Sequence, residues 1–130
     1  MLNIKGIHHV AIITDRYEES KRFYTEILGF DIIAETYREA RNSYKLDLAI
    51  AGKYQIELFS FPDFRERGSY PESKGLRHLA FEVSDVAAGI EWLRSQGVAN
   101  VQDVRIDELT GKKFTFFDDP NGQPLELYEV

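Results

Sequence analysis

The sequence predicts an α+β fold made of two tandem βαβββ modules. Residues 6–11 (GIHHVA) align with residues 75–80 (GLRHLA), and residues 56–59 (IELF) align with residues 125–128 (LELY), at one offset of 69 positions. Strand and helix patterns follow the same order in both halves. With 130 residues and 43% hydrophobic content, the chain is long enough for a single domain. We therefore expect one domain, 1–130, with modules at 1–61 and 75–130 and a linker at 62–74.

The first module begins with a β-branched stretch at residues 7–14, which is typical of a strand. Asp15 and Glu18 form a variant of the capping box, and Gly29 is a typical stop. Apolar residues at helical spacing between them predict a helix over 16–28. Three strands should follow, at 30–38, 43–51 and 54–61, with a tight turn at Ala51-Gly52-Lys53 between the last two.

The second module repeats this order after a stretch with two prolines, a glycine and mixed charge, which we interpret as the linker. We expect a strand at 75–83, then a helix over 85–96 that is capped by Ser84 or Asp85 and ended by Gly97. The remaining strands are predicted at 100–107, 112–118 and 124–129. The turn sequence Asp119-Pro120-Asn121-Gly122 separates the last two.

Composition excludes several classes of function. The net charge is −6 and the basic residues are scattered among acidic ones, whereas phosphate backbones require a concentrated basic surface, so no nucleic-acid partner is expected. The absence of cysteine excludes disulfides, thiolate metal sites and cysteine nucleophiles. No apolar run approaches the ~20 residues that a membrane span needs. We expect a soluble, cytoplasmic protein that does not bind membranes.

Two His–Glu pairs occur at identical spacing. His9 precedes Glu57 by 48 positions, and His78 precedes Glu126 by the same number. An imidazole and a carboxylate retained in both copies indicate a symmetric four-ligand site for a divalent ion such as Zn, Ni, Co, Mn or Fe. The repeat favours His9 over His8, because His78 aligns with His9. Each glutamate lies in an apolar strand, so its carboxylate must be exposed, paired or metal-bound.

Residues that could bind a substrate do not stand out from the pattern. Several cations could contact an anionic substrate, although a solvated surface explains most of them equally well: Arg65, Arg67, Lys74, Arg77, Lys112 and Lys113. Some aromatic residues could line a pocket or simply belong to the core: Tyr44, Phe59, Phe116 and Tyr128. The substrate-binding residues therefore stay unassigned.

The whole set of motifs resembles the vicinal oxygen chelate superfamily, which includes glyoxalase I, bleomycin-resistance proteins and extradiol dioxygenases. The resemblance rests on five segments spread over nearly the whole chain: GIHHVAI, FYTEILGF, YQIELFSF, GLRHLAFEV and FFDDPNGQPLELYEV. It implies that the strands curl into a cup around one divalent metal ion per site. It also implies a homodimer, often with a site built from modules of both chains.

A His/Glu/His/Glu ligand set is similar to that of the glyoxalase I branch. The resemblance implies that His9, Glu57, His78 and Glu126 hold the metal and that Glu126 or Glu57 is the general base. The expected activity is that of a metal-dependent lyase or isomerase acting on the hemithioacetal of a 2-oxoaldehyde and a thiol, or on a similar small chelating substrate. Proton transfer would pass through an enediolate.

Two other functions fit the same family. An extradiol-type dioxygenase or a thiol transferase would use two histidines and one glutamate, leaving Glu57 without a role. A bleomycin-resistance-type binding protein would need no stoichiometric metal. Two departures from bacterial glyoxalase I leave the thiol open: no arginine follows His9 on the first strand, and no asparagine follows Glu57.

Overall fold

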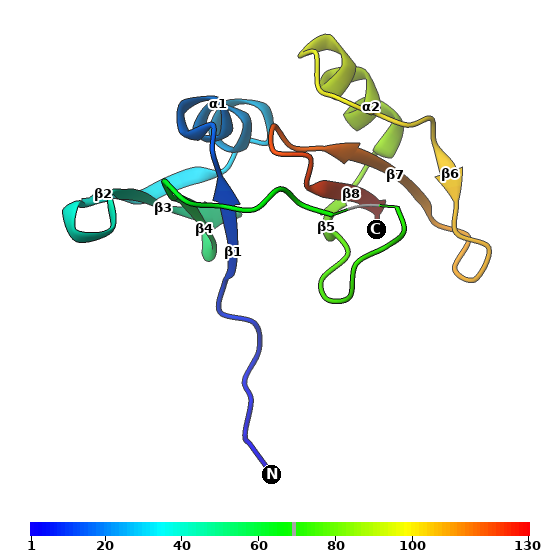
Figure 1. Ribbon diagram of the computed structural model, residues 1–130. Coiled ribbons are helices and arrows are strands. Elements are labelled where there is room, and N and C mark those ends of the chain that lie inside the picture. The colour runs from blue at the N-terminus through cyan, green and yellow to red at the C-terminus, as the bar shows by residue number, and fades with distance from the viewer. Residues whose placement is uncertain (69) are drawn as a thin grey trace. The chain divides into compact units, whose positions relative to one another are not determined.

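The computed structural model describes residues 1–68 and 70–130. The chain divides into two compact units, Met1–Arg65 and Glu66–Val130 (Figure 1). Each unit contains one helical segment and one four-stranded mixed sheet, in the order βαβββ. This confirms the predicted α+β class and the two βαβββ modules.

The first unit builds its sheet in the order β1-β4-β3-β2. Strand β1 is parallel to β4, and the other neighbours are antiparallel. A π-helical turn extends the helix, and a short 3₁₀ turn, Glu39–Arg41, joins β2 to β3. The elements are β1 Val10–Thr14, α1 Tyr17–Arg22, the π-helical turn Phe23–Ile27, β2 Asp31–Arg38, β3 Ser43–Ile50 and β4 Lys53–Ser60.

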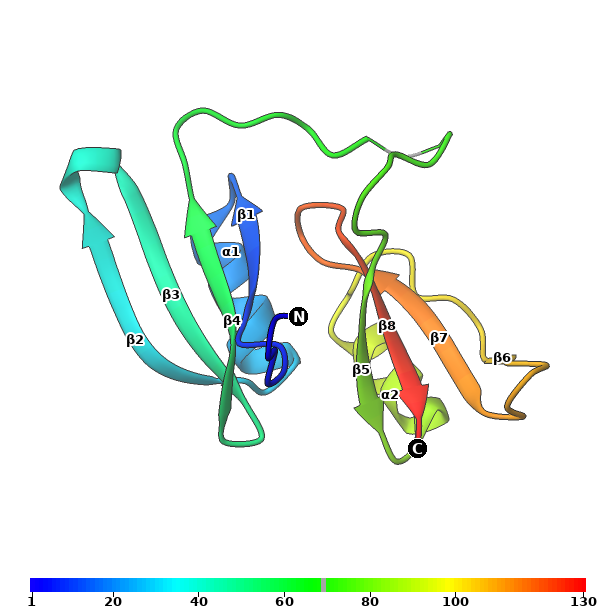
Figure 2. The same ribbon diagram turned by 90° about the horizontal axis from the view of Figure 1, so that it is seen from below.

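The second unit has the equivalent strand order, β5-β8-β7-β6, with β5 parallel to β8 (Figure 2). Strands β7 and β8 form a hairpin around the predicted Asp119 turn, where the Asp119 carboxylate accepts the backbone N–H groups of Asn121 and Gln123. The elements are β5 Leu79–Val83, α2 Val86–Ser95, β6 Arg105–Ile106, β7 Lys113–Asp118 and β8 Pro124–Glu129.

The offset of 69 positions holds in the strand pairing itself. Glu57 lies opposite Ala11 and Asp47, and Glu126 lies opposite the equivalent residues, Ala80 and Phe116. The two glutamates therefore occupy the same place in two copies of one sheet. Sequence repetition here reflects repetition of backbone geometry.

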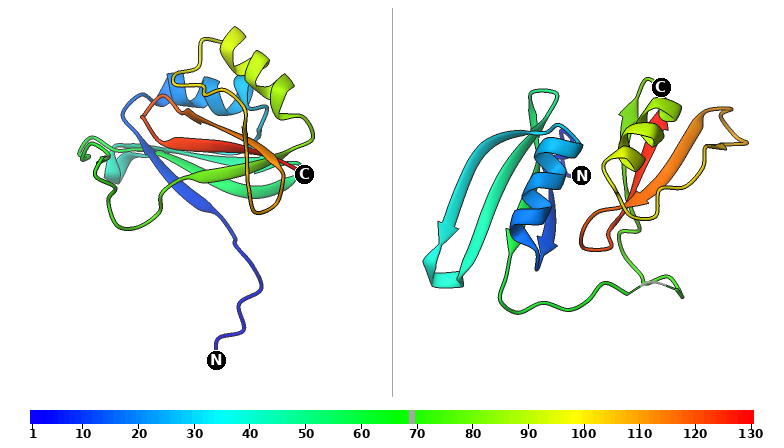
Figure 3. Two further views of the ribbon diagram at one scale, coloured as in Figure 1. Left: turned by 90° about the vertical axis from the view of Figure 1, so that its right-hand side faces the viewer. Right: turned by 90° about the horizontal axis from the view of Figure 1, so that it is seen from above.

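In each unit the helical segment covers one face of the sheet and leaves the other face open (Figure 3). Ile12 and Thr14 are buried on the covered face of β1, whereas Ala11 and Ile13 are exposed on the opposite face. Buried apolar side chains form the core of the first unit: Ile12, Phe23, Tyr24, Ile27, Leu46, Leu48, Ala49, Ile56 and Leu58. The second unit buries Val86, Ile90, Leu93, Phe117, Leu125 and Leu127.

Four predicted features differ from the structure. The strands expected at 7–14 and 75–83 begin later, at Val10 and Leu79. The strand expected at 100–107 is regular only at Arg105–Ile106, because this edge segment has little to bury: Val104 and Ile106 are both about half exposed. The capping box at Asp15 is wrong. The first helix begins at Tyr17 without a side-chain cap, and the hydroxyl of Thr14 accepts the backbone N–H of Arg16.

The cap of α2 is Asp85, whose carboxylate accepts the backbone N–H of Ala88 at 3.0 Å. We expect Asp85→Ala to lower the free energy of unfolding by about 1 kcal/mol, because the substitution leaves that N–H without its acceptor. Urea denaturation measures the change. Ser84→Ala is the matched control and should be nearly neutral. Equal effects of the two substitutions would contradict this assignment of the cap.

Within the part of the chain that the structure describes, the longest helix, α2, has 10 residues. No helix among these residues is long and apolar enough to cross a membrane.

Candidate metal centre

The first His–Glu pair joins the start of β1 to the middle of β4. His9 immediately precedes β1, so it lies one position outside the strand in which the sequence placed it. Its Nε2 atom lies 3.3 Å from Oε2 of Glu57. The imidazole is 37% exposed and the carboxylate 12% exposed. The parallel pairing of β1 with β4 brings the two side chains together on the open face of the sheet.

His8 contacts the other side of the His9 ring. The Nδ1 atoms of His8 and His9 are 2.8 Å apart, and the two rings meet edge to face. Hydrogen bonding at one ring nitrogen fixes the tautomer and leaves the other nitrogen for a metal or a proton. His8 therefore orients His9, whose Nε2 is directed to Glu57. Of the two histidines, His9 is the one whose Nε2 faces Glu57.

Glu57 is held by several polar neighbours. The Tyr54 hydroxyl donates a short hydrogen bond to Oε2 of Glu57 and lies 3.2 Å from Oδ1 of Asp47. Lys45 Nζ lies 3.2 Å from Asp47 and 3.9 Å from Glu57. Burial, together with the hydrogen bond to Glu57, raises the pKa of Tyr54, so its hydroxyl remains a donor. The Glu57 carboxylate is thus fixed in position.

The second pair has a different environment. His78 immediately precedes β5, and its Nε2 lies 3.4 Å from Oε1 of Glu126. Phe116 meets the His78 ring edge to face at 4.9 Å, and an Arg77 guanidinium nitrogen lies 3.4 Å from His78 Nδ1. Within residues 1–68 and 70–130, Glu126 has no hydrogen-bond donor comparable to the Tyr54 hydroxyl. Its carboxylate is therefore less constrained than that of Glu57.

The donor geometry of both pairs fits a metal ion. Two ligand atoms that each lie about 2.1 Å from one ion, at octahedral or tetrahedral angles, are about 3.0–3.4 Å apart. The observed separations of 3.3 and 3.4 Å match this range. Among the described residues, no three metal-ligating side chains gather in one group. Each module thus brings together two of the four predicted ligands.

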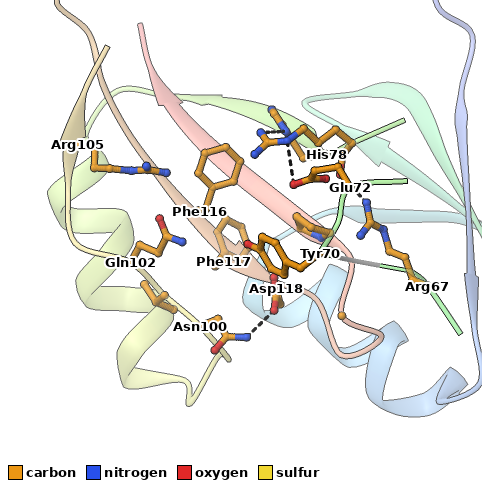
Figure 4. A pocket seen from close by; sticks show the side chains of 14 residues that line it. Arg67, Tyr70, Glu72, His78, Asn100, Gln102, Arg105, Phe116, Phe117 and Asp118 are labelled. Carbon is orange, nitrogen blue, oxygen red and sulfur yellow. Dashed lines mark hydrogen bonds and ion pairs between the residues drawn. The ribbon is translucent and has the colours of Figure 1, made fainter. Parts of the chain in front are cut away.

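A cavity of about 620 Å³ opens beside His78 within the second unit (Figure 4). Phe116 lines it, as the sequence suggested, together with Arg67 and Arg77. Tyr44, Phe59 and Tyr128 do not line it: Tyr44 stacks on Tyr17, Phe59 lies under the Arg38 guanidinium, and Tyr128 bonds to Asp107.

Arg105 also lines this cavity, although sequence analysis missed it. Its position in a predicted edge strand gave no indication that its side chain would line a cavity. The pairing of Arg105 with Phe114 in neighbouring strands is the feature that could have indicated it.

Comparison with known proteins defines the class. Residues 6–127 match the family model of the Glyoxalase/Bleomycin resistance protein/Dioxygenase superfamily, and the chain belongs to this superfamily. This confirms the resemblance seen in the sequence.

Three relatives illustrate the range within this class. The chain is 56% identical over 126 residues to the protein YwkD of Bacillus subtilis (strain 168), covering 97% of this chain and 98% of that protein. It is similar to the crystal structure of a glyoxalase family protein from Enterococcus faecalis, with 46% identity, a TM-score of 0.89, and coverage of 98% and 100%. It is 31% identical over 128 residues to the metallothiol transferase FosB of Staphylococcus haemolyticus, with coverage of 96% and 84%.

Proposed function

We propose that the protein is a metal-dependent lyase or isomerase of the glyoxalase I type. Its substrate would be the hemithioacetal of a 2-oxoaldehyde and a thiol, or a similar small chelating molecule. The observation that carries the proposal is the pair of equivalent His–Glu contacts, at 3.3 and 3.4 Å, on two copies of one sheet. Members of the superfamily typically use a divalent metal and are often dimers, so we expect one ion per site in a cytoplasmic homodimer.

The four ligands in this proposal are His9, Glu57, His78 and Glu126. A divalent ion bound by them would act as a Lewis acid that stabilises negative charge on the substrate oxygens. Zn, Ni, Co, Mn and Fe all accept imidazole and carboxylate ligands. The donor set fits these metals and excludes none of them.

The surroundings of the two glutamates favour Glu126 as the general base. Glu57 accepts a hydrogen bond from Tyr54 and lies 3.9 Å from Lys45. Glu126 contacts His78 and is held by fewer polar groups of the described chain. A general base must take up a proton and release it again. Fixed hydrogen bonds to the carboxylate would hinder both steps. Glu126 would remove the proton from one substrate carbon and return it to the neighbouring carbon. The product would be a 2-hydroxyacyl thioester.

A methylglyoxal assay with a panel of thiols tests this function. With the metal at saturation, we expect Glu126→Gln to lower kcat at least about 100-fold, because general-base catalysis contributes roughly 10²–10⁴. The exposed Glu108→Gln is the matched control and should keep full activity. Absence of turnover with every thiol, in protein that carries a stoichiometric metal ion, would contradict the proposed reaction.

A second candidate is a thiol transferase with two histidines and one glutamate. The 31% identity to the metallothiol transferase FosB favours it. In that case His9, His78 and Glu126 would suffice for metal binding, and Glu57 would be dispensable.

A further inference from the structure

The aromatic wall of the cavity beside His78 carries two guanidinium groups. The Arg105 guanidinium lies 4.9 Å from the ring centre of Phe114 and 5.4 Å from that of Phe116. Arg77 contributes a second guanidinium, 5.9 Å from the Phe116 ring centre. Figure 4 shows Phe116 between Arg105 and His78. The two cations therefore share one aromatic surface next to a proposed metal ligand.

Arg105 keeps its hydrogen-bonding edge available. Stacking on a ring uses the flat face of a guanidinium and leaves its N–H groups directed outward in the plane. No carboxylate among residues 1–68 and 70–130 forms an ion pair with Arg105, and no hydrogen bond of its side chain occurs among them. A cation that is oriented by two rings and has unused donors is suited to bidentate binding of an oxyanion.

The other charged groups of the cavity leave it electropositive. Glu72 lies 3.5 Å from Nε of Arg77 and offsets part of its charge, and Asp118 accepts a hydrogen bond from Asn100. Arg67 adds a third cation and donates to the backbone carbonyl of Arg77. Three arginines and two carboxylates line the cavity, so its lining carries one net positive charge in a chain whose net charge is −6.

This arrangement does not repeat in the first module. At the offset of 69 positions, Thr36 replaces Arg105, Lys45 replaces Phe114, and Asp47 replaces Phe116. Strand pairing aligns Thr36 with Lys45 just as it aligns Arg105 with Phe114. The proposed metal ligands are duplicated, whereas the arginine–aromatic wall belongs to the second module alone. The wall is therefore suited to bind one end of an asymmetric substrate.

We propose that Arg105 and Arg77 bind an oxyanion group of the substrate, a carboxylate, phosphate or phosphonate, beside His78. This inference rests on the proposed function for the identity of the neighbouring reaction centre. The oxyanion lies against Phe116 in the cavity wall, and the rest of the molecule extends toward His78. The two arginines thus select small anionic substrates and orient them.

Anion binding to the metal-free protein tests the inference separately from catalysis. The full chain, stripped of metal with a chelator, is titrated with inorganic phosphate, methylphosphonate and acetate while amide NMR shifts are followed. We expect at least one of the three to bind at millimolar concentration and to shift the signals of residues around Phe116. The tightest binder identifies the oxyanion. Arg105→Gln and Arg77→Gln should each weaken binding by about 10-fold.

Two further variants sharpen the test. Arg105→Lys keeps the charge but loses the planar fork, so its affinity should lie between those of the wild type and Arg105→Gln. Arg94→Gln removes an exposed arginine of α2 that pairs with Asp103 outside the cavity, and should bind anions like the wild type.

The inference is overturned if none of the three anions shifts these signals, or if Arg105→Gln and Arg77→Gln bind them as the wild type does. Anion binding without any divalent-ion binding would overturn the proposed function while supporting this inference.

Discussion

Replacing Glu57 with alanine is expected to lower the affinity for a divalent ion at least about 100-fold and to abolish turnover. Loss of a residue that merely supports a ligand already costs 10–100-fold, and Glu57 is proposed as a ligand itself. Its carboxylate lies 3.3 Å from Nε2 of His9, nearly the same separation as in the second pair. Isothermal titration of the metal-free protein with Zn²⁺ or Ni²⁺ measures the change.

Two control variants show whether the loss of metal affinity in Glu57→Ala comes from the missing ligand or from a nonspecific change in the protein. Tyr54→Phe removes the hydroxyl that donates to Glu57 but keeps the carboxylate, so its loss of metal affinity should be much smaller. Glu108→Ala removes an exposed carboxylate and should have no effect. Metal affinity within a few-fold of the wild type in Glu57→Ala would reject the four-ligand site and favour the transferase-type site with three ligands.

The largest expected effect on stability belongs to Leu58. This side chain is completely buried in β4, between β1 and β3. We expect Leu58→Ala to lower the free energy of unfolding by about 2–5 kcal/mol, because it leaves a cavity in a close-packed core. The unit contains only about half of the chain, and small cores have little stability in reserve. Urea denaturation followed by circular dichroism measures the loss.

Leu109→Ala is the matched control, because Leu109 is 96% exposed and its truncation removes no buried contact. A loss below 1 kcal/mol for Leu58→Ala would show that β4 is not the centre of this core. The equivalent substitution in the second unit, Leu127→Ala, should also destabilise the protein. Leu127 packs so close to Gly89 that a Cβ there would lie 2.6 Å from its Cδ1 atom.

Much of the fold could be predicted because the chain repeats one βαβββ module. When the two modules are aligned, a strand with an ambiguous apolar pattern in one module can be placed from the equivalent strand in the other. The turn at Ala51-Gly52, where both residues have positive φ, and the cap at Asp85 follow from local chemistry. Elements that depend on burial were harder to place. The edge segment before Arg105 alternates like a strand, but Val104 and Ile106 stay about half exposed, so burial does little to order it.

The same duplication explains what could be predicted about the site. It identified the four proposed ligands, because they repeat, and it could not identify their surroundings, because these differ. Tyr54 contacts Glu57 from three positions earlier in β4, and Lys45 contacts it from the neighbouring strand β3. The period-2 alternation of a strand predicts neither contact. Arg105 lies far from His78 in sequence and approaches its cavity only through the pairing of β6 with β7. The features of the site that differ between the two modules could therefore be identified only in the structure.

The stoichiometry of metal binding tests the central claim most directly. Metal-free protein is titrated with a divalent ion, and the bound metal is then quantified after dialysis. If His9, Glu57, His78 and Glu126 form one site, the protein will bind one ion per chain, and alanine at any of the four positions will abolish tight binding. Two ions per chain would mean that each His–Glu pair binds metal alone. That result, or the absence of any tightly bound ion, would contradict a single site built from both modules.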